Sequence, residues 1–473
     1  MQIVIILRNN LWAFVKDSRP IDDRIIYDTL SIKVEGARFS PAYKQGRWDG
    51  YERLYSLSGR YFPSGLISTV EKELIRKGIP FKVKEARKAP KAQIKSLAVV
   101  APYLREDQKE AAQTAIAQTG GIIQAATGSG KTLLAVAITR ALDLPTLFLV
   151  NQADLMHQAA NQYLARGGTT VGKIGEGLWE PHPEFTVATI QTLHRRLSSE
   201  KVQNFLAGIQ VLFVDECHGV AAKSSYKVAM STKNTYYRFG LSGTPLDRTD
   251  GRNLRVVAAL GPVIYKLSSG EAISQNLLSK AEINFIEPSY IGYDLSLTGS
   301  YFRVYKHGIE FCEERNKLIT HICNVANKPA LVFCNTVRHA CAVRDGLQEV
   351  GLRTELVWGA WGGEARLEAL QKLGKGILEV VVSSPVFDSG IDLPELQSVI
   401  IAAGGKSPIK LLQRIGRGMR KTSTKSTFEV WDIFDSAHRY LANHTWDRIR
   451  VLKREGFTVN RIKEEDIEKK KEK

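Results

Sequence analysis

A segment in the first third of the chain joins an apolar stretch to a helix-forming stretch through a glycine-rich loop. Residues 121–124 are the apolar lead, 125–132 are the loop, and 133–142 favour a helix. Glycines let the loop curl so that its amides face an anion, and the helix N-terminus adds positive potential. Lys131 can reach the β- and γ-phosphates, and Thr132 can hold Mg²⁺. This pattern predicts a strand–loop–helix unit that binds a nucleoside triphosphate through Ala126, Thr127, Gly128, Ser129, Gly130, Lys131 and Thr132.

The charge balance narrows the class of partner. The chain has 473 residues, a net charge of +17 and a pI near 9.5. That length allows about three domains of ~150 residues each. So basic a chain favours a polyanion as partner, above all nucleic acid, although a merely soluble basic surface is the alternative.

The cysteines and the apolar runs bear on the compartment. The chain has five cysteines with wide spacings and no CxxC pair, so neither a zinc site nor a disulfide framework is indicated. Cys217 and Cys334 lie beside buried-strand patterns and are predicted to be core residues. We expect a reducing, cytoplasmic setting, which is the host cytoplasm if a phage encodes the chain. We expect neither a membrane helix nor a signal peptide.

Residues 1–95 are predicted to form a small, basic α+β domain. They contain 19 Lys and Arg against 10 Asp and Glu. Strands are predicted at 3–7, 30–34 and 81–83, and a helix at 68–77 with Val70, Leu74 and Ile75 on one face. Residues 39–50 mix aromatic and basic side chains, of which Lys44 and Arg47 are predicted DNA contacts. Tyr43 and Trp48 in the same segment fit either a DNA-binding surface or the core of the domain.

Two larger domains are predicted after a basic linker at 86–93. Apolar strands at 147–150, 185–190, 211–214 and 239–241 alternate with helices over 96–268, and strands at 330–333, 378–382 and 398–401 repeat this rhythm over 269–455. Continuously apolar strands that alternate with helices are typical of parallel sheets covered on both faces. Sites on such sheets lie at the carboxyl ends of the strands. Residues 456–473 form a charged tail, whose end at 463–473 is predicted to be a solvated helix.

Two acidic residues follow directly after the apolar run 211–214. Hydrolysis of a triphosphate needs Mg²⁺, charge neutralisation and an aligned water. Asp215 can hold Mg²⁺, and Glu216 can polarise the attacking water. A solvated turn is the alternative for such a pair, but the upstream phosphate loop favours the catalytic interpretation.

A helix predicted near residue 411–420 carries two arginines three residues apart, Arg417 and Arg420. They can contact a phosphate backbone or merely keep the surface soluble, or they can stabilise the γ-phosphate in the transition state as arginine fingers. In the second case two domains must close around the nucleotide, which would couple the ATP state to domain movement.

The ordered set of segments resembles the superfamily 2 helicases and translocases over roughly 350 residues. The matching segments contain, in order, the glutamine motif, the phosphate loop, two nucleic-acid motifs, Asp-Glu-Cys-His at 215–218, Ser-Gly-Thr-Pro at 242–245, and three motifs in the second large domain at 333–338, 384–392 and 413–420. The resemblance implies two tandem RecA-like parallel-sheet domains, an α/β fold class, with ATP and Mg²⁺ as cofactors.

The resemblance also implies roles for individual residues. Arg105 and Gln108 would read the adenine, Asp392 would meet the ribose, Gly390 would lie near the phosphates, and Gln413 would sense the γ-phosphate. Nucleic-acid backbone contacts would come from Thr189, Gln191, Asn335 and Ser384. Coupling of the two clefts would come from His218, Ser242 and Thr244. Because most contacts would go to the backbone, sequence specificity should be low.

Two departures disfavour the RNA-remodelling DEAD-box branch. Cys217-His218 stands where that branch has Ala-Asp, and Ser389 stands where it usually has arginine. Residues 37–50 and 62–66, and later 430–435 with His444 and Arg448, resemble the UvsW-type helicases of phages, which move Holliday junctions, regress stalled forks and unwind D- or R-loops. The resemblance implies a DNA helicase that acts on branched or forked DNA in recombination and repair. A duplex translocase without strand separation, an ATP-gated clamp and an RNA helicase are the alternatives, and protein partners stay unknown.

Overall fold

The computed structural model describes residues 2–470 except 92, 127, 248–249, 290–299, 362, 385–392, 394, 406, 417, 420–424 and 426. The chain divides into two compact units, which are described separately. One comprises Met1–Ala125 with Gly130–Lys266, and the other comprises Ala126–Ser129 with Leu267–Lys473. No described helix is both long and apolar enough to cross a membrane.

The first unit begins with a small sheet of four strands in the order β5 (Tyr61–Pro63), β2 (Trp12–Lys16), β1 (Ile3–Leu7) and β6 (Phe81–Glu85). Strand β1 is antiparallel to β2 and parallel to β6. A separate hairpin pairs β3 (Ser31–Lys33) with β4 (Tyr51–Arg53). The helical elements of this region are α1 (Pro20–Thr29), η1 (Ala37–Phe39), α2 (Pro41–Lys44), η2 (Ser64–Leu66) and α3 (Ile67–Arg76).

These elements confirm the predicted α+β character of the N-terminal region, with one error in a helix face. Val70 and Leu74 of α3 are buried as predicted, but Ile75 is 68% exposed. Residues 70 and 74 are four apart and share a face, whereas 75 is turned about 100° from 74. The described N-terminal core does not include Tyr43 or Trp48, and Tyr43 is 42% exposed, so the core interpretation of these two aromatics is wrong.

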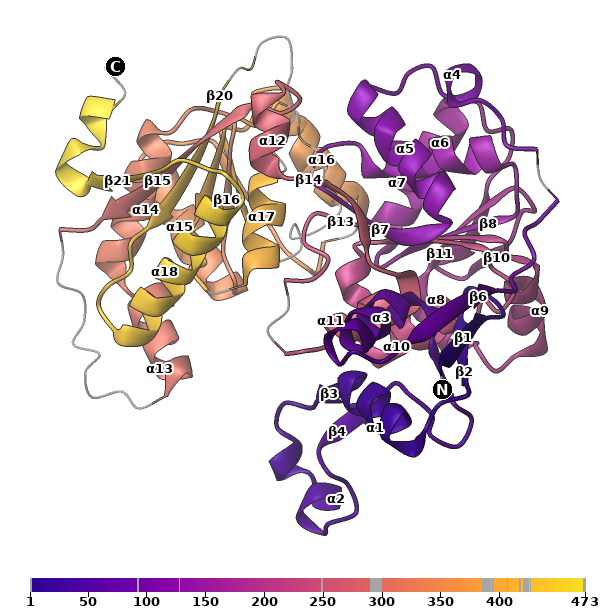
Figure 1. The fold of residues 1–473 in the computed structure, drawn as a ribbon. Helices are drawn as coiled ribbons and strands as arrows, with labels where there is room; N and C mark the ends of the chain where they lie inside the picture. Colours follow the sequence, from indigo (N-terminus) through magenta and orange to yellow (C-terminus); the bar gives the residue numbers. More distant parts are fainter. Residues whose placement is uncertain are drawn as a thin grey trace. The chain divides into compact units, whose positions relative to one another are not determined.

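The N-terminal core is shared with a helix from much later in the chain. Ile3, Phe62 and Val70 cluster with Ala258 of α11 (Asn253–Leu260), and Figure 1 shows α3 beside α11. A Cβ atom at Gly65 would lie 2.1 Å from the Val257 carbonyl oxygen, so only glycine permits this close approach. The predicted boundary near residue 95 stays a prediction, since the region before it packs onto α11.

The rest of the first unit is an eight-stranded sheet in the order β10-β9-β11-β8-β12-β13-β7-β14. The bounds are β7 (Gly120–Ala125), β8 (Thr146–Val150), β9 (Gly172–Gly175), β10 (Leu178–Glu180), β11 (Phe185–Thr189), β12 (Val211–Asp215), β13 (Tyr237–Ser242) and β14 (Val263–Leu267). Neighbours from β9 to β7 pair in parallel, as continuously apolar strands predict. Among the strand pairs described in this sheet, only the pair of β10 with β9 at the edge is antiparallel.

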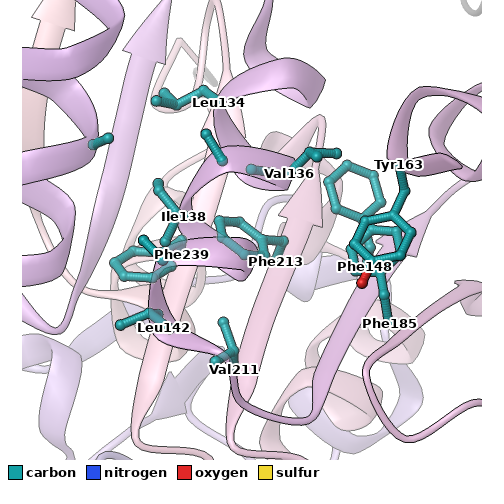
Figure 2. Packing of buried hydrophobic residues seen from close by; sticks show 14 of the residues in the cluster. Leu134, Val136, Ile138, Leu142, Phe148, Tyr163, Phe185, Val211, Phe213 and Phe239 are labelled. Carbon is teal, nitrogen blue, oxygen red and sulfur yellow. The ribbon is translucent and has the colours of Figure 1, made fainter. Parts of the chain in front are cut away.

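Helices cover both faces of this sheet. One apolar cluster joins it to α4 (Leu97–Val100), α5 (Glu106–Gln118), α6 (Lys131–Leu142) and α7 (Ala153–Ala165). The other cluster joins it to α8 (Ile190–Arg195), α9 (Glu200–Gly208), the 3₁₀ turn η3 (Cys217–Ala221), α10 (Lys223–Met230) and α11. Figure 2 shows the first cluster, where Tyr163 stacks on Phe185 at 4.4 Å between ring centroids and Phe213 lies 5.2 Å from Phe239.

The second unit is built on a seven-stranded sheet in the order β17-β18-β16-β19-β20-β15-β21. Its strands are β15 (Lys280–Glu287), β16 (Ala330–Phe333), β17 (Thr354–Val357), β18 (Val380–Ser383), β19 (Ser398–Ile401), β20 (Thr427–Ile433) and β21 (Val459–Lys463). Its helical segments are α12 (Ser269–Ser274), α13 (Tyr301–Tyr305), the π-helical turn η4 (Lys306–Glu310), α14 (Glu313–Val325), α15 (Val337–Glu349), α16 (Gly363–Gly374), α17 (Pro408–Gly416) and α18 (Arg439–Arg454). All its described strand pairs are parallel, which confirms two parallel-sheet α/β domains.

The end of the chain differs from its predicted form. Strand β21 pairs in parallel with β15, and the short 3₁₀ turns η6 (Glu464–Asp466) and η7 (Glu468–Lys470) follow it. Ile467 is fully buried in the core of the second unit. A single apolar side chain therefore anchors a segment whose composition alone indicates a solvated helix.

Cys217 and Cys334 are buried, as predicted.

Candidate active site

The phosphate loop connects β7 to α6, as its sequence predicts. Gly128 and Gly130 have φ angles of +87° and +90°, in the region that favours glycine. The amide of Ser129 donates to the Ala126 carbonyl at 3.1 Å, which curls the turn. Lys131 is the first residue of α6, and its Nζ lies 3.2 Å from the carbonyl oxygen of Ala125. Thr132 follows in the first helical turn, so an anion-binding helix N-terminus carries both predicted phosphate and metal ligands.

Gln108, the predicted adenine reader, lies against this loop. Its side chain is almost fully buried, and a Cβ atom placed on Gly130 would lie 2.6 Å from its Nε2. Its Oε1 accepts a hydrogen bond of 3.2 Å from the backbone amide of Arg105, the N-cap residue of α5. The guanidinium of Arg105 binds Asp107. The cap at the start of α5 thus holds the Gln108 amide beside the phosphate loop.

Asp215 and Glu216 lie at the carboxyl end of β12, where the sheet rule places a site. Asp215 ends the strand and is 9% exposed. Glu216 has a φ of +46°, a backbone conformation that is costly for a residue with a side chain. The Gly219 amide donates to the Glu216 carbonyl at 2.9 Å and holds the turn into η3. The chain therefore turns directly after the two carboxylates.

The two carboxyl groups differ in their electrostatics. Burial raises the pKa of Asp215, and the neighbouring Glu216 charge raises it further, while Lys131 opposes both effects. Burial also opposes ionisation of Glu216, but hydrogen bonds from His218 and Ser242 and the charge of Lys131 outweigh it and lower its pKa. The effect of Lys131 on both groups shows that the phosphate loop and the Asp-Glu pair act on each other electrostatically.

Two of the three predicted coupling residues, Ser242 and His218, contact Glu216, and the third, Thr244, contacts Ser242. Ser242, the last residue of β13, donates from Oγ to Oε2 of Glu216 at 3.1 Å. Nδ1 of His218 lies 3.3 Å from Oε2 of Glu216 and 3.3 Å from Oγ of Ser242. The amide of Thr244 donates to Oγ of Ser242 at 3.2 Å. One hydroxyl therefore joins the 215–218 segment to the 242–245 segment.

Sequence reasoning missed Gln124 as a further link in this region. Its Nε2 donates to the Gly243 carbonyl at 3.3 Å, and the register of β7 and β13 pairs it with Ser242. The signal was available, since Gln124 is the polar residue at the end of the apolar run 121–124 that precedes the phosphate loop. It ties the strand before the loop to the segment 242–245.

The predicted nucleic-acid contacts occur in three places. Lys44 and Arg47 are exposed in the N-terminal region. Thr189 ends β11, and its hydroxyl donates to Thr192 at 2.8 Å. Gln191 follows the strand, and its Nε2 donates to the Asn151 carbonyl at 2.9 Å. Thr189 itself is buried.

Asn335 and Ser384 follow β16 and β18 of the second unit. The amide of Asn335 donates to the Tyr305 hydroxyl at 2.8 Å, and Arg414 donates to its Oδ1 at 3.4 Å. Ser384 is buried, with its amide on the Val357 carbonyl. Sequence reasoning missed Tyr305, although it stands in an aromatic run at 301–305.

The remaining predicted nucleotide residues are in the second half of the chain or in the loop. Gln413 lies in α17 and is partly exposed. Five of the predicted site residues lie outside the described part of the structure, namely Thr127, Gly390, Asp392, Arg417 and Arg420.

Three protein families match successive parts of this chain. DNA helicase UvsW, N-terminal, matches residues 20–83. Type III restriction enzyme, res subunit, matches residues 102–247. Helicase conserved C-terminal domain matches residues 313–422. The order of these matches is the order of the three predicted domains.

Individual relatives match over longer stretches. ATP-dependent DNA helicase uvsW of Enterobacteria phage T4 is 26% identical over 475 residues, covering 91% of this chain and 93% of its own. DNA 3'-5' translocase XPB2 of Sulfurisphaera tokodaii is 26% identical over 363 residues, covering 67% of this chain and 79% of its own. The solved structure of the ATP-dependent Type ISP restriction-modification enzyme LlaBIII bound to DNA has a TM-score of 0.58 at 17% identity, over 78% of this chain and 32% of that one. That last likeness bears on the fold alone.

Proposed function

Because the chain is an ATP-hydrolysing helicase of superfamily 2 with UvsW-like character, we propose that it remodels branched DNA in recombination and repair. The match to phage T4 uvsW extends over 91% of the chain and includes the N-terminal region, which the general motor does not require. That full-length match is the observation that carries the proposal. The reactions we propose are junction branch migration, fork regression and the unwinding of D- and R-loops.

The residues around the phosphate loop fit ATP with Mg²⁺. The positive-φ glycines give the curled backbone that a triphosphate needs, and Lys131 supplies a cation at a helix N-terminus. Thr132 and Asp215 offer the oxygen ligands that Mg²⁺ prefers. When bound, the metal neutralises charge on the phosphate oxygens. Gln108, with Arg105, would contact the adenine.

Glu216 would act as the group that orients and polarises the attacking water. Its lowered pKa keeps it ionised, and an anionic carboxylate can accept a proton or a hydrogen bond from water. Ser242 and His218 hold the carboxylate through Oε2, which leaves Oε1 for this task. We propose that Gln413, Gly390, Asp392, Arg417 and Arg420 complete the nucleotide site from the second unit, so that turnover drives movement between the units.

The N-terminal region would select the DNA structure. Lys44 and Arg47 are exposed beside exposed aromatic side chains, Phe39 at 67% and Tyr43 at 42%. Cations on phosphates and rings on bases or sugars are a common combination in nucleic-acid binding. Thr189, Gln191, Asn335 and Ser384 would add backbone contacts within the motor.

A duplex-DNA translocase that does not separate strands is the second candidate. The similarity to XPB2, which is named a DNA 3'-5' translocase, favours it. Both candidates use the same ATP site, and they differ in the product formed from DNA.

The two candidates are separated by one panel of substrates. ATPase stimulation and strand release are measured on single-stranded DNA, blunt duplex, forked duplex, a four-way junction and an RNA duplex. Preferential stimulation and product release on forks and junctions would support the proposal. Stimulation by blunt duplex without release would favour the translocase, release of RNA strands would favour an RNA helicase, and a rate that ignores nucleic acid would overturn all three.

A further inference from the structure

Helix α11 lies between the N-terminal core and the turn that follows Glu216. It contacts η2 of the N-terminal region and η3, which starts at Cys217. Its Ala258 belongs to the N-terminal core, while its Val256 and Leu260 belong to the core that contains Cys217 and Val220. At Gly65 the backbone of the N-terminal region lies directly against the backbone of α11, so a movement of one would displace the other. One helix therefore packs on both the proposed DNA-binding region and the catalytic turn.

A buried arginine on α11 bridges these two sides. Arg255 has a side chain that is 3% exposed, and its Nε donates to Glu52 of β4 at 2.8 Å, with a second bond from its terminal nitrogen to the same carboxylate. Its Nη1 donates to the Ala221 carbonyl at 2.6 Å. Ala221 is the last residue of η3, whose second residue is His218. The Arg255 guanidinium thus connects Glu52, which lies 203 positions away in the sequence, to the end of η3 at Ala221.

The same helix is also tied to the segment that follows Ser242. The side-chain amide of Asn253, at the start of α11, donates to the Leu246 carbonyl at 2.6 Å. A Cβ atom at Gly240 would meet both Leu260 of α11 and Cys217 within 3.0 Å. Any displacement of α11 would therefore act on both segments that hold Glu216, namely 215–218 and 242–245.

On the other side, the aromatic–basic segment is fastened to strand β4. Trp48 Nε1 donates to the Tyr51 carbonyl at 2.7 Å, and the guanidinium of Arg53 binds Asp49. Arg53 also lies over the rings of Tyr51 and Tyr27, at 4.6 and 4.7 Å. Glu52 lies between Tyr51 and Arg53 in β4, so a displacement of the segment 39–50 would act directly on Glu52.

We propose that Glu52 and Arg255 are positioning residues that transmit DNA occupancy of the N-terminal region to Glu216. DNA bound at Lys44 and Arg47 would shift β4, the Glu52–Arg255 pair would pull on the Ala221 carbonyl, and η3 would adjust His218 and Glu216. The inference rests on the proposed DNA contact of the N-terminal region.

The substitution Glu52→Gln tests it, because Glu52 is 25% exposed and glutamine keeps its size while removing the charge that holds Arg255. Turnover is measured without DNA and at saturating forked DNA, together with the Kd for DNA, the KM for ATP and the melting temperature. We expect DNA-stimulated kcat to fall on the order of 5-fold or more, the scale of site-to-site coupling. The basal kcat, the Kd for DNA and the KM for ATP should change less than about 2-fold, and the melting temperature should stay close to that of the wild type.

The matched control is Glu73→Gln, which breaks the ion pair with Arg76 on α3 without touching α11. It should leave DNA stimulation unchanged. The variant Arg255→Lys, alone and combined with Glu52→Gln, completes a double-mutant cycle, and a transmitting pair gives non-additive effects on the stimulated rate.

Three outcomes would overturn the inference. They are an equal fall of basal and stimulated kcat, a loss of affinity that accounts for the whole effect, and an unchanged stimulated rate. Failure of the proposed function is seen separately, since Lys44→Ala/Arg47→Ala reports DNA contact through Kd, whereas Glu52→Gln is measured with DNA at saturation.

Discussion

The hydroxyl of Ser242, at the end of β13, donates to the carboxylate of Glu216, which directly follows β12, at 3.1 Å. Strands β12 and β13 are neighbours, and their register pairs Asp215 with Leu241. The residues that follow this pair, Glu216 and Ser242, therefore meet at the same edge of the sheet. This contact connects the group proposed to orient water with the segment proposed to couple hydrolysis to movement.

Removal of the Glu216 charge should separate nucleotide binding from turnover. We expect Glu216→Gln to lower kcat by at least about 100-fold, the range for loss of a general base, while ATP affinity changes little. The measurements are steady-state phosphate release and equilibrium binding of a fluorescent ATP analogue. Glu180→Gln, on the exposed edge strand β10, is the control and should behave as wild type. Turnover within a few-fold of wild type would remove Glu216 from its proposed role.

Loss of the Ser242 hydroxyl should affect coupling more than hydrolysis. Ser242→Ala removes the link between Glu216 and the Thr244 amide but leaves His218 beside the carboxylate. We expect DNA-stimulated ATPase to stay within a few-fold of wild type and strand separation per ATP hydrolysed to fall several-fold. Both are measured in one reaction on a forked duplex. Ser231→Ala, which removes a hydroxyl at the end of α10, is the control. A proportional loss of both activities would contradict a coupling role.

Charge removal on the N-terminal surface should change the salt dependence of DNA binding. Each phosphate contact adds about 0.9 to the slope of log K against log salt, so Lys44→Ala/Arg47→Ala should reduce that slope by about 1.8. Fluorescence anisotropy on a four-way junction measures it. The control Lys82→Ala/Lys84→Ala removes the same charge from the exposed side of β6. An equal change of this slope in both double variants would indicate only a general electrostatic effect of the protein's positive charge.

The paired substitution is a better test of this surface than deletion of residues 1–95. The deletion would strip the N-terminal core from α11 and expose Ala258.

Lys131→Ala offers the complementary case, because it should abolish ATP hydrolysis while the N-terminal surface still binds DNA. Loss of DNA binding in that variant would contradict a separate DNA-binding role.

The buried His339 should make the second unit sensitive to acid. Burial lowers its pKa to about 3, and the nearby Arg315 charge lowers it too. The unfolded chain binds this proton at a pKa of about 6.5, so between these values the unfolded state holds more protons. The contribution of His339 to stability is therefore complete above about pH 6.5 and is lost as the pH falls towards 3.

The substitution His339→Gln isolates this group. It retains a donor for Asn316 Oδ1, which His339 Nε2 meets at 3.1 Å. We expect the denaturation midpoint of the wild type to fall more steeply than that of the variant between pH 6.5 and 4, followed by tryptophan fluorescence. His194→Gln in the first unit is the control for loss of a histidine. Parallel curves for wild type and His339→Gln would contradict the assignment.

Much of the motor could be predicted because its signals are local. The strand, glycine loop and helix at 121–142 follow one another along the chain, so propensity and spacing suffice to place Lys131 and Thr132. The same holds for Asp215 and Glu216, which follow an apolar strand. The order of the motifs then added Ser242, His218 and Thr244 by resemblance. In the structure Ser242 and His218 contact Glu216, and Thr244 contacts Ser242.

Other features could not be predicted from local patterns. Ile467 is fully buried and anchors a tail that is otherwise charged. Burial of a single side chain depends on which distant surface covers it. Neither hydrophobic periodicity nor charge content carries that information.

The sequence by itself determined the α/β motor, the phosphate loop and the Asp-Glu pair, because each is encoded in a contiguous run of backbone and side-chain preferences. Only the tertiary structure decided that Glu52 meets Arg255, which lies 203 positions away in the sequence. It also decided that α11 packs into both the N-terminal core and the core that contains Cys217. Such contacts arise when the chain buries apolar surface at long range, where many partners satisfy the same local pattern and packing selects one of them.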